Sequence, residues 1–232
     1  MAVDFEDTDP AMDDVFESAA ALQRLVPDAV LVGGSAAAFY AHHRSSFDHD
    51  HVLIDLRERF DVVLDAVESE GESVTNRVSH GRIILGELGG IEAGVRQLIR
   101  RTPLEVTEYT LPSGARLRVP TIEETLRVKA FLAVRRNQTR DYLDIAALAQ
   151  TMGENHAAEV LAGMDSFYSD QRGSGEGVAS QAARQLSEPQ PADRNVTKEL
   201  SSDKNLAPRW HRWQDVARAC QRLADLMVRR QA

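Results

Sequence analysis

The chain has 232 residues, of which 43% are hydrophobic and 27% charged, and its formal net charge is −9. This composition is typical of a globular protein, and no apolar run approaches the roughly 20 residues that a membrane-spanning helix needs. A single cysteine, Cys220, excludes an internal disulfide and a thiolate-only metal site. The acidic N-terminal segment lacks a secretion-signal pattern, so we expect a cytoplasmic protein with no membrane partner.

The first 120 residues alternate between short helices and strands. Residues 10–25 carry apolar side chains at helical spacing, and a short buried strand follows at 29–32. Gly33 and Gly34 then predict a tight turn, with Ser35 as the cap of a helix. Further along, the patterns predict a helix at 55–71 and strands at 47–54, 73–79, 81–88, 90–98, 104–111 and 115–120.

After Pro120 the pattern becomes helical. Thr121 with Glu124 is typical of a capping box, and Thr139 is expected to cap the next helix. Residues 169–205 are rich in Ser, Gly, Pro, Gln and Asn, which predicts a long loop or partly disordered linker. We therefore expect an α+β fold, with a small mixed sheet and helices in a core domain at 1–120. A helical C-terminal region at 121–232 contains the loop-rich segment.

The chemistry is concentrated in residues 32–56, VGGSAAAFYAHHRSSFDHDHVLIDL. Side chains two apart in a strand point to the same face, so Asp48 and Asp50 project together. Two carboxylates at this spacing can bind a hard divalent cation and leave positions open for phosphate oxygens. These two residues are therefore the predicted metal ligands and catalytic residues, with Mg²⁺ as the expected ion and Mn²⁺ as the alternative.

The turn before them is suited to phosphate. Gly33 and Gly34 let the backbone approach a ligand closely, and the N–H groups of Gly34 and Ser35 open a helix whose positive end favours anions. Ser46, two residues before Asp48, shares the face of the aspartates if the strand starts early. We therefore expect all four residues to contact the nucleotide.

Four histidines in the same stretch suggest a zinc or manganese phosphohydrolase centre instead. His49 and His51 would lie on the strand face opposite the aspartates, and the adjacent His42 and His43 cannot easily face one ion. This alternative is therefore the weaker one.

Two features beyond the sheet complete the pattern. Lys129 is the only lysine before Lys198 in a chain that otherwise uses arginine, and a compact ammonium suits a triphosphate. Arg140-Asp141-Tyr142-Leu143-Asp144 follows on the next helix. A strand, Gly-Gly-Ser, a helix and Asp-x-Asp resemble the polymerase-β-like nucleotidyltransferases. With Arg44-Ser45-Ser46-Phe47-Asp48-His49-Asp50, Lys129 and Arg-Asp-x-x-Asp in this order, residues 30–150 resemble the AbiEii family of nucleotidyltransferase toxins, which includes the mycobacterial MenT toxins.

The resemblance implies transfer of NMP from an NTP to the 3′ end of tRNA, arrest of translation and a cognate antitoxin as partner. It favours Asp141 as a supporting catalytic residue, although capping or an ion pair is the likelier interpretation from spacing alone. Arg136 is a further candidate nucleotide contact. The third carboxylate of many nucleotidyltransferases has one candidate here, Glu92, on the strand predicted at 90–98. Ten basic residues at 96–140 predict either an RNA-facing surface or arginines scattered over solvated faces of helices and strands, and charge alone does not separate the two.

Two alternatives stay open. The acceptor could be a hydroxyl group of a protein or a small molecule rather than RNA. The chain could also be a catalytically silent protein of the same fold that acts only through binding, which a misplaced Glu92 would favour.

Overall fold

The computed structural model describes residues 10–69, 73–171, 175–203 and 205–231. The chain divides into two compact units, which we call unit 1 (residues 1–39 and 45–121) and unit 2 (residues 40–44 and 122–232). Among the described residues, no helix has both the length and the apolar character that crossing a membrane requires.

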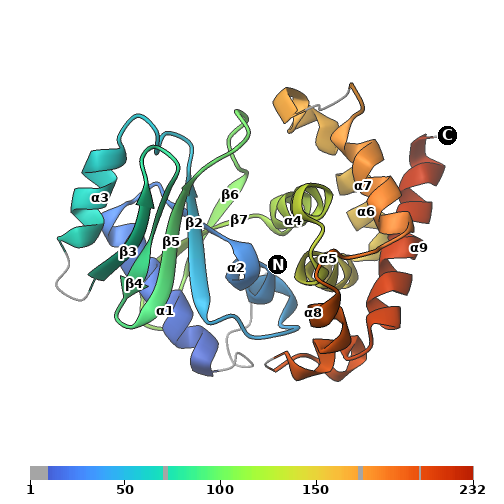
Figure 1. Cartoon of the computed structure of the whole chain (residues 1–232), viewed down its shortest axis with the longest axis horizontal. Coiled ribbons are helices and arrows are strands. Elements are labelled where there is room, and N and C mark those ends of the chain that lie inside the picture. Colours follow the sequence, from blue (N-terminus) through green and yellow to red (C-terminus); the bar gives the residue numbers. More distant parts are fainter. Residues whose placement is uncertain (1–9, 70–72, 172–174, 204, 232) are drawn as a thin grey trace. The chain divides into compact units, whose positions relative to one another are not determined.

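Unit 1 is built on a five-stranded sheet in the order β1-β2-β5-β4-β3 (Figure 1). Strands β2 and β5 are parallel and the other neighbours are antiparallel, so the sheet is mixed, as predicted. A separate hairpin, β6-β7, completes the strands. Their bounds are β1 Val30–Val32, β2 Asp48–Leu53, β3 Ser73–Ser79, β4 Ile83–Leu88, β5 Ile91–Gln97, β6 Val106–Thr110 and β7 Arg116–Pro120.

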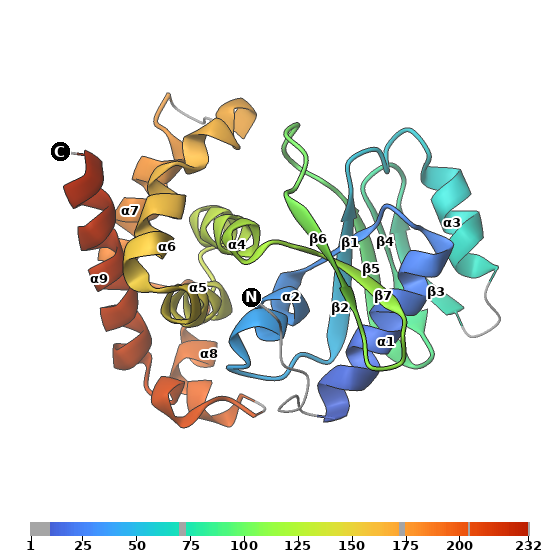
Figure 2. The same cartoon turned by 180° about the vertical axis from the view of Figure 1, so that it is seen from behind.

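One face of the sheet is covered by two helices, α1 (Pro10–Leu25) and α3 (Phe60–Glu68), which lie on the same side of it (Figure 2). Leu22 of α1 and Val63 of α3 share a core cluster with Ile84 and Val95 of the strands. Burial of this apolar surface is the main stabilising contribution of the unit. The opposite face, which we call the open face, carries the alternate residues of each strand.

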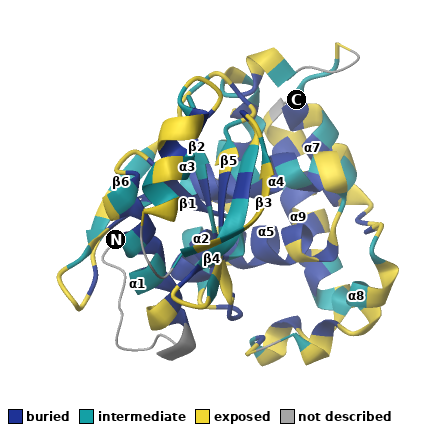
Figure 3. Ribbon diagram, turned by 60° about the vertical axis from the view of Figure 1, so that its left-hand side comes forward, coloured by how far each residue is buried: buried dark blue, intermediate teal, exposed yellow. Residues whose placement is uncertain are grey.

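Unit 2 is helical. Helix α5 is buried along almost its whole length, from Asp141 to Ala149 (Figure 3). Helix α9 packs on α5, α6 and α7 with Val216, Cys220 and Leu223 buried, so Cys220 is a core residue. The helices are α4 Ile122–Arg136, α5 Thr139–Met152, α6 Glu154–Ala162, α7 Val178–Ser187, α8 Arg194–Lys198 and α9 Trp213–Gln231.

Three local predictions were wrong. Residues 169–205 contain α7 and α8 rather than a plain loop, because Ala179, Ala182, Ala183 and Leu186 form a buried stripe at helical spacing within a polar composition. The helix starting at Gly33 already includes Ser35, so this serine is not its cap. At the start of α5, the Thr139 hydroxyl donates to Asp193 instead of capping the helix.

Candidate functional site

Strand β2 separates the acidic and imidazole side chains of the opening motif. Asp48 and Asp50 lie on the open face, whereas His49 and His51 point to the covered face and are buried. The described residues contain no group of three or more His, Cys, Asp or Glu side chains that could hold a metal ion. The imidazoles of His49 and His51 and the carboxylates of Asp48 and Asp50 therefore lie on opposite faces of β2.

The carboxylate of Asp50 rests between two glycines. Gly33, the residue directly after β1, has φ +78, a conformation that strains any residue with a side chain. Gly94, on β5, pairs directly with Asp50, and a Cβ atom placed there would lie 2.6 Å from Asp50 Oδ1. The same oxygen accepts a hydrogen bond of 3.1 Å from Nε of Arg96. Two glycines and one arginine thus set the position of Asp50.

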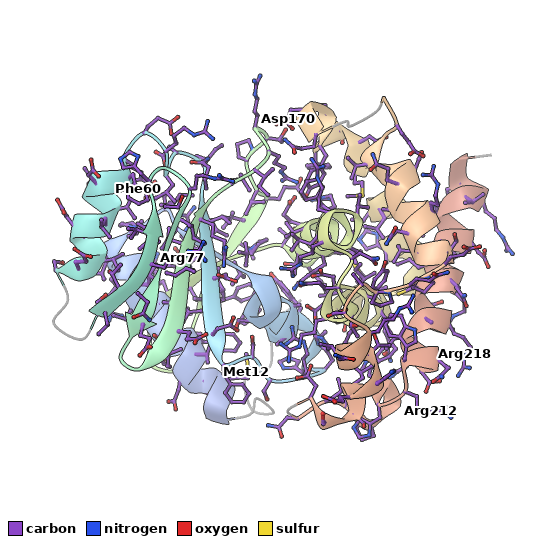
Figure 4. The ribbon with its side chains drawn as sticks, viewed as in Figure 1. Met12, Phe60, Arg77, Asp170, Arg212 and Arg218 are labelled. Atoms are coloured by element: carbon purple, nitrogen blue, oxygen red, sulfur yellow. The ribbon has the colours of Figure 1, made fainter. Side chains whose placement is uncertain are left out.

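Asp48 is held by two serines. The Ser46 hydroxyl donates to Asp48 Oδ1 over 2.8 Å, and the Ser35 hydroxyl donates to the backbone carbonyl of Asp48. The backbone N–H of Ser46 is in turn directed at the sulfur of Met12, labelled in Figure 4. Because the Ser35 proton is used within the protein, this hydroxyl fixes β2 against α2 (Gly33–Ala41) in the described state.

The open face around these residues is hollowed by a cavity of about 300 Å³. Glu92 lies in it as the register partner of Asp48 on the parallel strand β5. Magnesium is commonly bound by one or two carboxylates together with substrate phosphates, and the oxygen donors of Asp48 and Asp50 fit this pattern. Glu92 as a third ligand stays a prediction, since the described side chains form no three-carboxylate group.

A second polar cluster lies inside unit 2, with Asp144 at its centre. This buried carboxylate accepts hydrogen bonds from His43 Nε2 at 2.7 Å and Arg44 Nε at 2.9 Å, and Lys129 Nζ lies 2.6 Å away. Burial alone would raise the pKa of Asp144, but Arg44, Lys129 and His43 hold it well below 3.8. Asp144 is therefore ionised and is the counter-charge of two buried cations, Arg44 and Lys129.

Asp141 occupies the edge of this cluster. Its two oxygens accept a bidentate pair of hydrogen bonds from Arg136, both 2.7 Å long, and Lys129 Nζ lies 3.9 Å from Oδ1. Lys129, Arg136 and Asp141 are thus brought together in unit 2, and Asp48 and Asp50 in unit 1. That Lys129 and the aspartates of β2 act on one nucleotide remains a prediction.

Sequence reasoning missed the role of three residues in this cluster: His43, Arg44 and Asp144. Asp144 is the second aspartate of Arg-Asp-x-x-Asp, one helical turn after Asp141, so both could have been placed near Lys129. No local pattern pairs residues 43 and 44 with a helix 100 positions later. That contact arises only in the folded chain.

A match to a known family decides the identity of this arrangement. Residues 18–222 match the profile of the nucleotidyl transferase AbiEii toxin family of type IV toxin–antitoxin systems. The chain belongs to the AbiEii family. The resemblance seen in four short motifs is thereby confirmed, and the family profile extends beyond residue 150 into α9.

Solved structures share the fold of this AbiEii-family chain. MenT4, a nucleotidyltransferase toxin of Mycobacterium tuberculosis, has a TM-score of 0.55 at 16% identity, covering 94% of this chain and 82% of that one. A protein from H. pylori described as a nucleotidyltransferase has a TM-score of 0.51 at 16% identity, covering 96% of both chains. These likenesses confirm the predicted α+β fold class.

Curated relatives match in sequence but are much longer. The heme uptake protein MmpL11 of Mycobacterium tuberculosis is 33% identical over 239 aligned positions, which cover 92% of this chain and 22% of that protein. The probable transport protein MmpL11 of Mycobacterium bovis matches to the same extent. The AbiEii-family chain therefore spans about a fifth of the length of these relatives.

The close fit of the Asp50 carboxylate between Gly33 and Gly94 gives a first prediction for this family member. In Gly94→Ala, the added methyl group would meet Asp50 Oδ1 at 2.6 Å and Leu85 at 3.0 Å, so the carboxylate must move. A misplaced catalytic group costs about 10²-fold in rate, and we expect a loss of that order in nucleotidyl transfer. Gly163→Ala, whose Cβ would have no contact closer than 3.7 Å, is the matched control. Unchanged activity in Gly94→Ala would show that nucleotidyl transfer does not depend on the position of the Asp50 carboxylate against Gly94.

The covered histidines give a second prediction, on stability. Burial lowers the pKa of His49 to about 4 and that of His51 well below 6.5. Both stay neutral in the folded state while the unfolded chain takes up protons, so this stabilisation is complete above pH 6.5 and is lost as the pH falls from 6.5 towards about 4. Urea unfolding at pH 7 and pH 5 should show this loss, and His49→Gln should reduce it. Substitution of the exposed His80 by Gln should not, and equal pH dependence in both variants would contradict the assignment.

Proposed function

We propose that this AbiEii-family chain transfers NMP from an NTP to the 3′ end of tRNA, in a reaction that depends on a divalent metal ion. The observation that carries the proposal is the placement of Asp48 and Asp50 on the open face of the sheet, beside the Gly33-Gly34 turn. Backbone N–H groups at a helix start and two fixed carboxylates are the parts that phosphate transfer needs from a protein.

The residues have distinct tasks in this reaction. The N–H groups of Gly34 and Ser35 bind triphosphate oxygens. Lys129 and Arg136, which pair with Asp144 and Asp141 within unit 2, are further nucleotide contacts that the family resemblance implies. A magnesium ion held by Asp48 and Asp50 would neutralise charge on the triphosphate when bound. The 3′-hydroxyl oxygen of the acceptor attacks the α-phosphorus, the bond to the β-phosphate oxygen breaks, and pyrophosphate leaves. Asp48 is the candidate acceptor of the hydroxyl proton.

The biological setting follows from the family. AbiEii proteins are the toxins of toxin–antitoxin pairs, so we propose a cognate antitoxin as partner. Blocking the 3′ end of tRNA in the cytoplasm would stop aminoacylation and therefore translation and growth.

One labelling experiment tests the proposal. The protein is incubated with each labelled NTP, Mg²⁺ and total tRNA, with EDTA and periodate-oxidised tRNA as controls. We expect label on tRNA that both controls abolish, because oxidation destroys the terminal hydroxyl groups. Label on protein or on a small molecule would instead support the alternative acceptors. The absence of label from every acceptor would support a silent binding protein.

A further inference from the structure

The basic residues expected to face RNA are largely engaged elsewhere. Arg116 pairs with Glu108, Arg127 with Glu124, Arg136 with Asp141 and Arg140 with Asp203. Arg100 is buried and donates to backbone carbonyls. The predicted stretch at 96–140 is thus not a continuous free cationic surface, and another cation has to meet the acceptor near the aspartates.

Arg77 on β3 meets this requirement. The register aligns Asp50 with Gly94, Gly94 with Leu85 and Leu85 with Arg77, so one row across the open face leads from the aspartate to the arginine. Arg77 lines the same cavity as Asp48 and Asp50, is exposed, and has no ion-pair partner among the described residues. Figure 4 shows it against the strands of the sheet.

A β-bulge puts Arg77 on this face. The pairing of β3 with β4 shifts between Thr75 and Arg77, leaving Asn76 as the extra residue. Without the extra residue, Arg77 would pair with Ile84, whose side chain belongs to the covered core. Bulges commonly redirect side chains next to active sites. The irregularity therefore brings a cation into the cavity that a regular strand would turn away from it.

The position of Arg77 indicates which substrate it meets. The glycine turn lies on the β1 side of β2, whereas β5, β4 and β3 extend to the other side. With the triphosphate at the glycine turn, the second substrate has to enter across β5, β4 and β3. Arg77 is three strand spacings from Asp50, about 14 Å between backbones, which is too far for the attacking hydroxyl group but suits a phosphate further along a polynucleotide.

We propose that Arg77 binds a backbone phosphate of the RNA acceptor and positions its 3′ end beside Asp48 and Asp50. The inference rests on the proposed function, because it assigns the acceptor side of the same site. Arg77 is a positioning residue, since it contacts the acceptor away from the reacting atoms. A point charge is sufficient for a phosphate contact, so lysine should replace it better than any neutral residue.

The test compares Arg77→Glu, Arg77→Ala and Arg77→Lys with Arg24→Glu. Arg24 is an exposed arginine of α1 on the covered side of the sheet, so its replacement makes the same charge change away from the cavity. We expect Arg77→Glu to weaken tRNA binding in the absence of NTP about tenfold. The slope of the logarithm of the binding constant against the logarithm of the salt concentration should fall by about one in magnitude. The KM for tRNA should rise to the same extent while the KM for NTP stays unchanged. Arg77→Lys should restore most of the affinity.

The outcomes separate the two proposals. Wild-type protein that labels RNA, together with Arg77→Glu that binds and labels tRNA normally, would overturn this inference alone. A rise only in the KM for NTP would also overturn it, by assigning Arg77 to the triphosphate. Wild-type protein that neither binds nor labels tRNA would overturn the proposed function and the acceptor assignment with it.

Discussion

Asp50→Asn is expected to lower nucleotidyl transfer by about 10³-fold, the upper range for removing one fixed electrostatic contact to a transition state. The amide keeps the size of the side chain between Gly33 and Gly94 but loses the charge that a divalent ion needs. Asp48→Asn should have an effect of the same order, since Asp48 is also the candidate base. Initial rates of label transfer measure the effect, and thermal unfolding checks that the fold is intact.

The control for both variants is Asp61→Asn. Asp61 is an exposed carboxylate on α3, outside the cavity of the open face. Its replacement should leave the rate unchanged. A transfer rate of Asp50→Asn within tenfold of the wild-type rate would contradict the assignment of Asp50 on β2 as a catalytic residue.

Asp144→Ala is expected to destabilise the protein by about 3–5 kcal/mol, the usual cost of removing one partner of a buried ion pair. Arg44 and Lys129 would remain buried without their counter-charge. Because the pKa of Asp144 lies well below 3.8 in the folded state, its stabilisation is present above pH 4 and is lost as the pH falls through the folded pKa. Urea unfolding at pH 7 measures the difference.

Asp215→Asn is the matched control in unit 2. The Asp215 carboxylate is partly exposed and also pairs with two arginines, Arg212 and Arg218, which Figure 4 labels. Exposed pairs contribute little, because solvent screens them. Asp144→Ala as stable as this control would show that the buried cluster does not stabilise the fold.

The elements of unit 1 could be predicted because they follow local rules. Alternation of period two places Asp48 and Asp50 on one face of β2 and His49 on the other, and the structure confirms this separation. The pairing of strands could not be predicted, because β2 has its parallel neighbour β5 more than 40 residues later. For the same reason the contact between Gly94 and Asp50 has no signal in a single sequence.

The candidate site in unit 2 shows a different limit. Lys129 and Asp141 were selected by type and motif order, but Asp144, which lies 2.6 Å from the Lys129 ammonium group, was passed over. Spacing along α5 treats Asp141 and Asp144 alike, since both lie near its start. Both are fully buried, and their partners separate their tasks: Asp144 meets the imidazole of His43 and the guanidinium of Arg44, whereas Asp141 meets the half-exposed Arg136.

The chain enters unit 2 twice, first for only five residues, 40–44, and again from residue 122. Residues 40–44 are held in unit 2 by hydrogen bonds from His43 and Arg44 to Asp144. The backbone carbonyl of His43 also accepts a hydrogen bond from the N–H of Ala207. Cleavage after Thr121 would therefore not yield two autonomous halves. The first fragment would keep Arg44 without its carboxylate, and the second would keep Asp144 without its arginine. The segment between Gly34 and Asp48, which contains residues 40–44, therefore depends on the helical half for its folding.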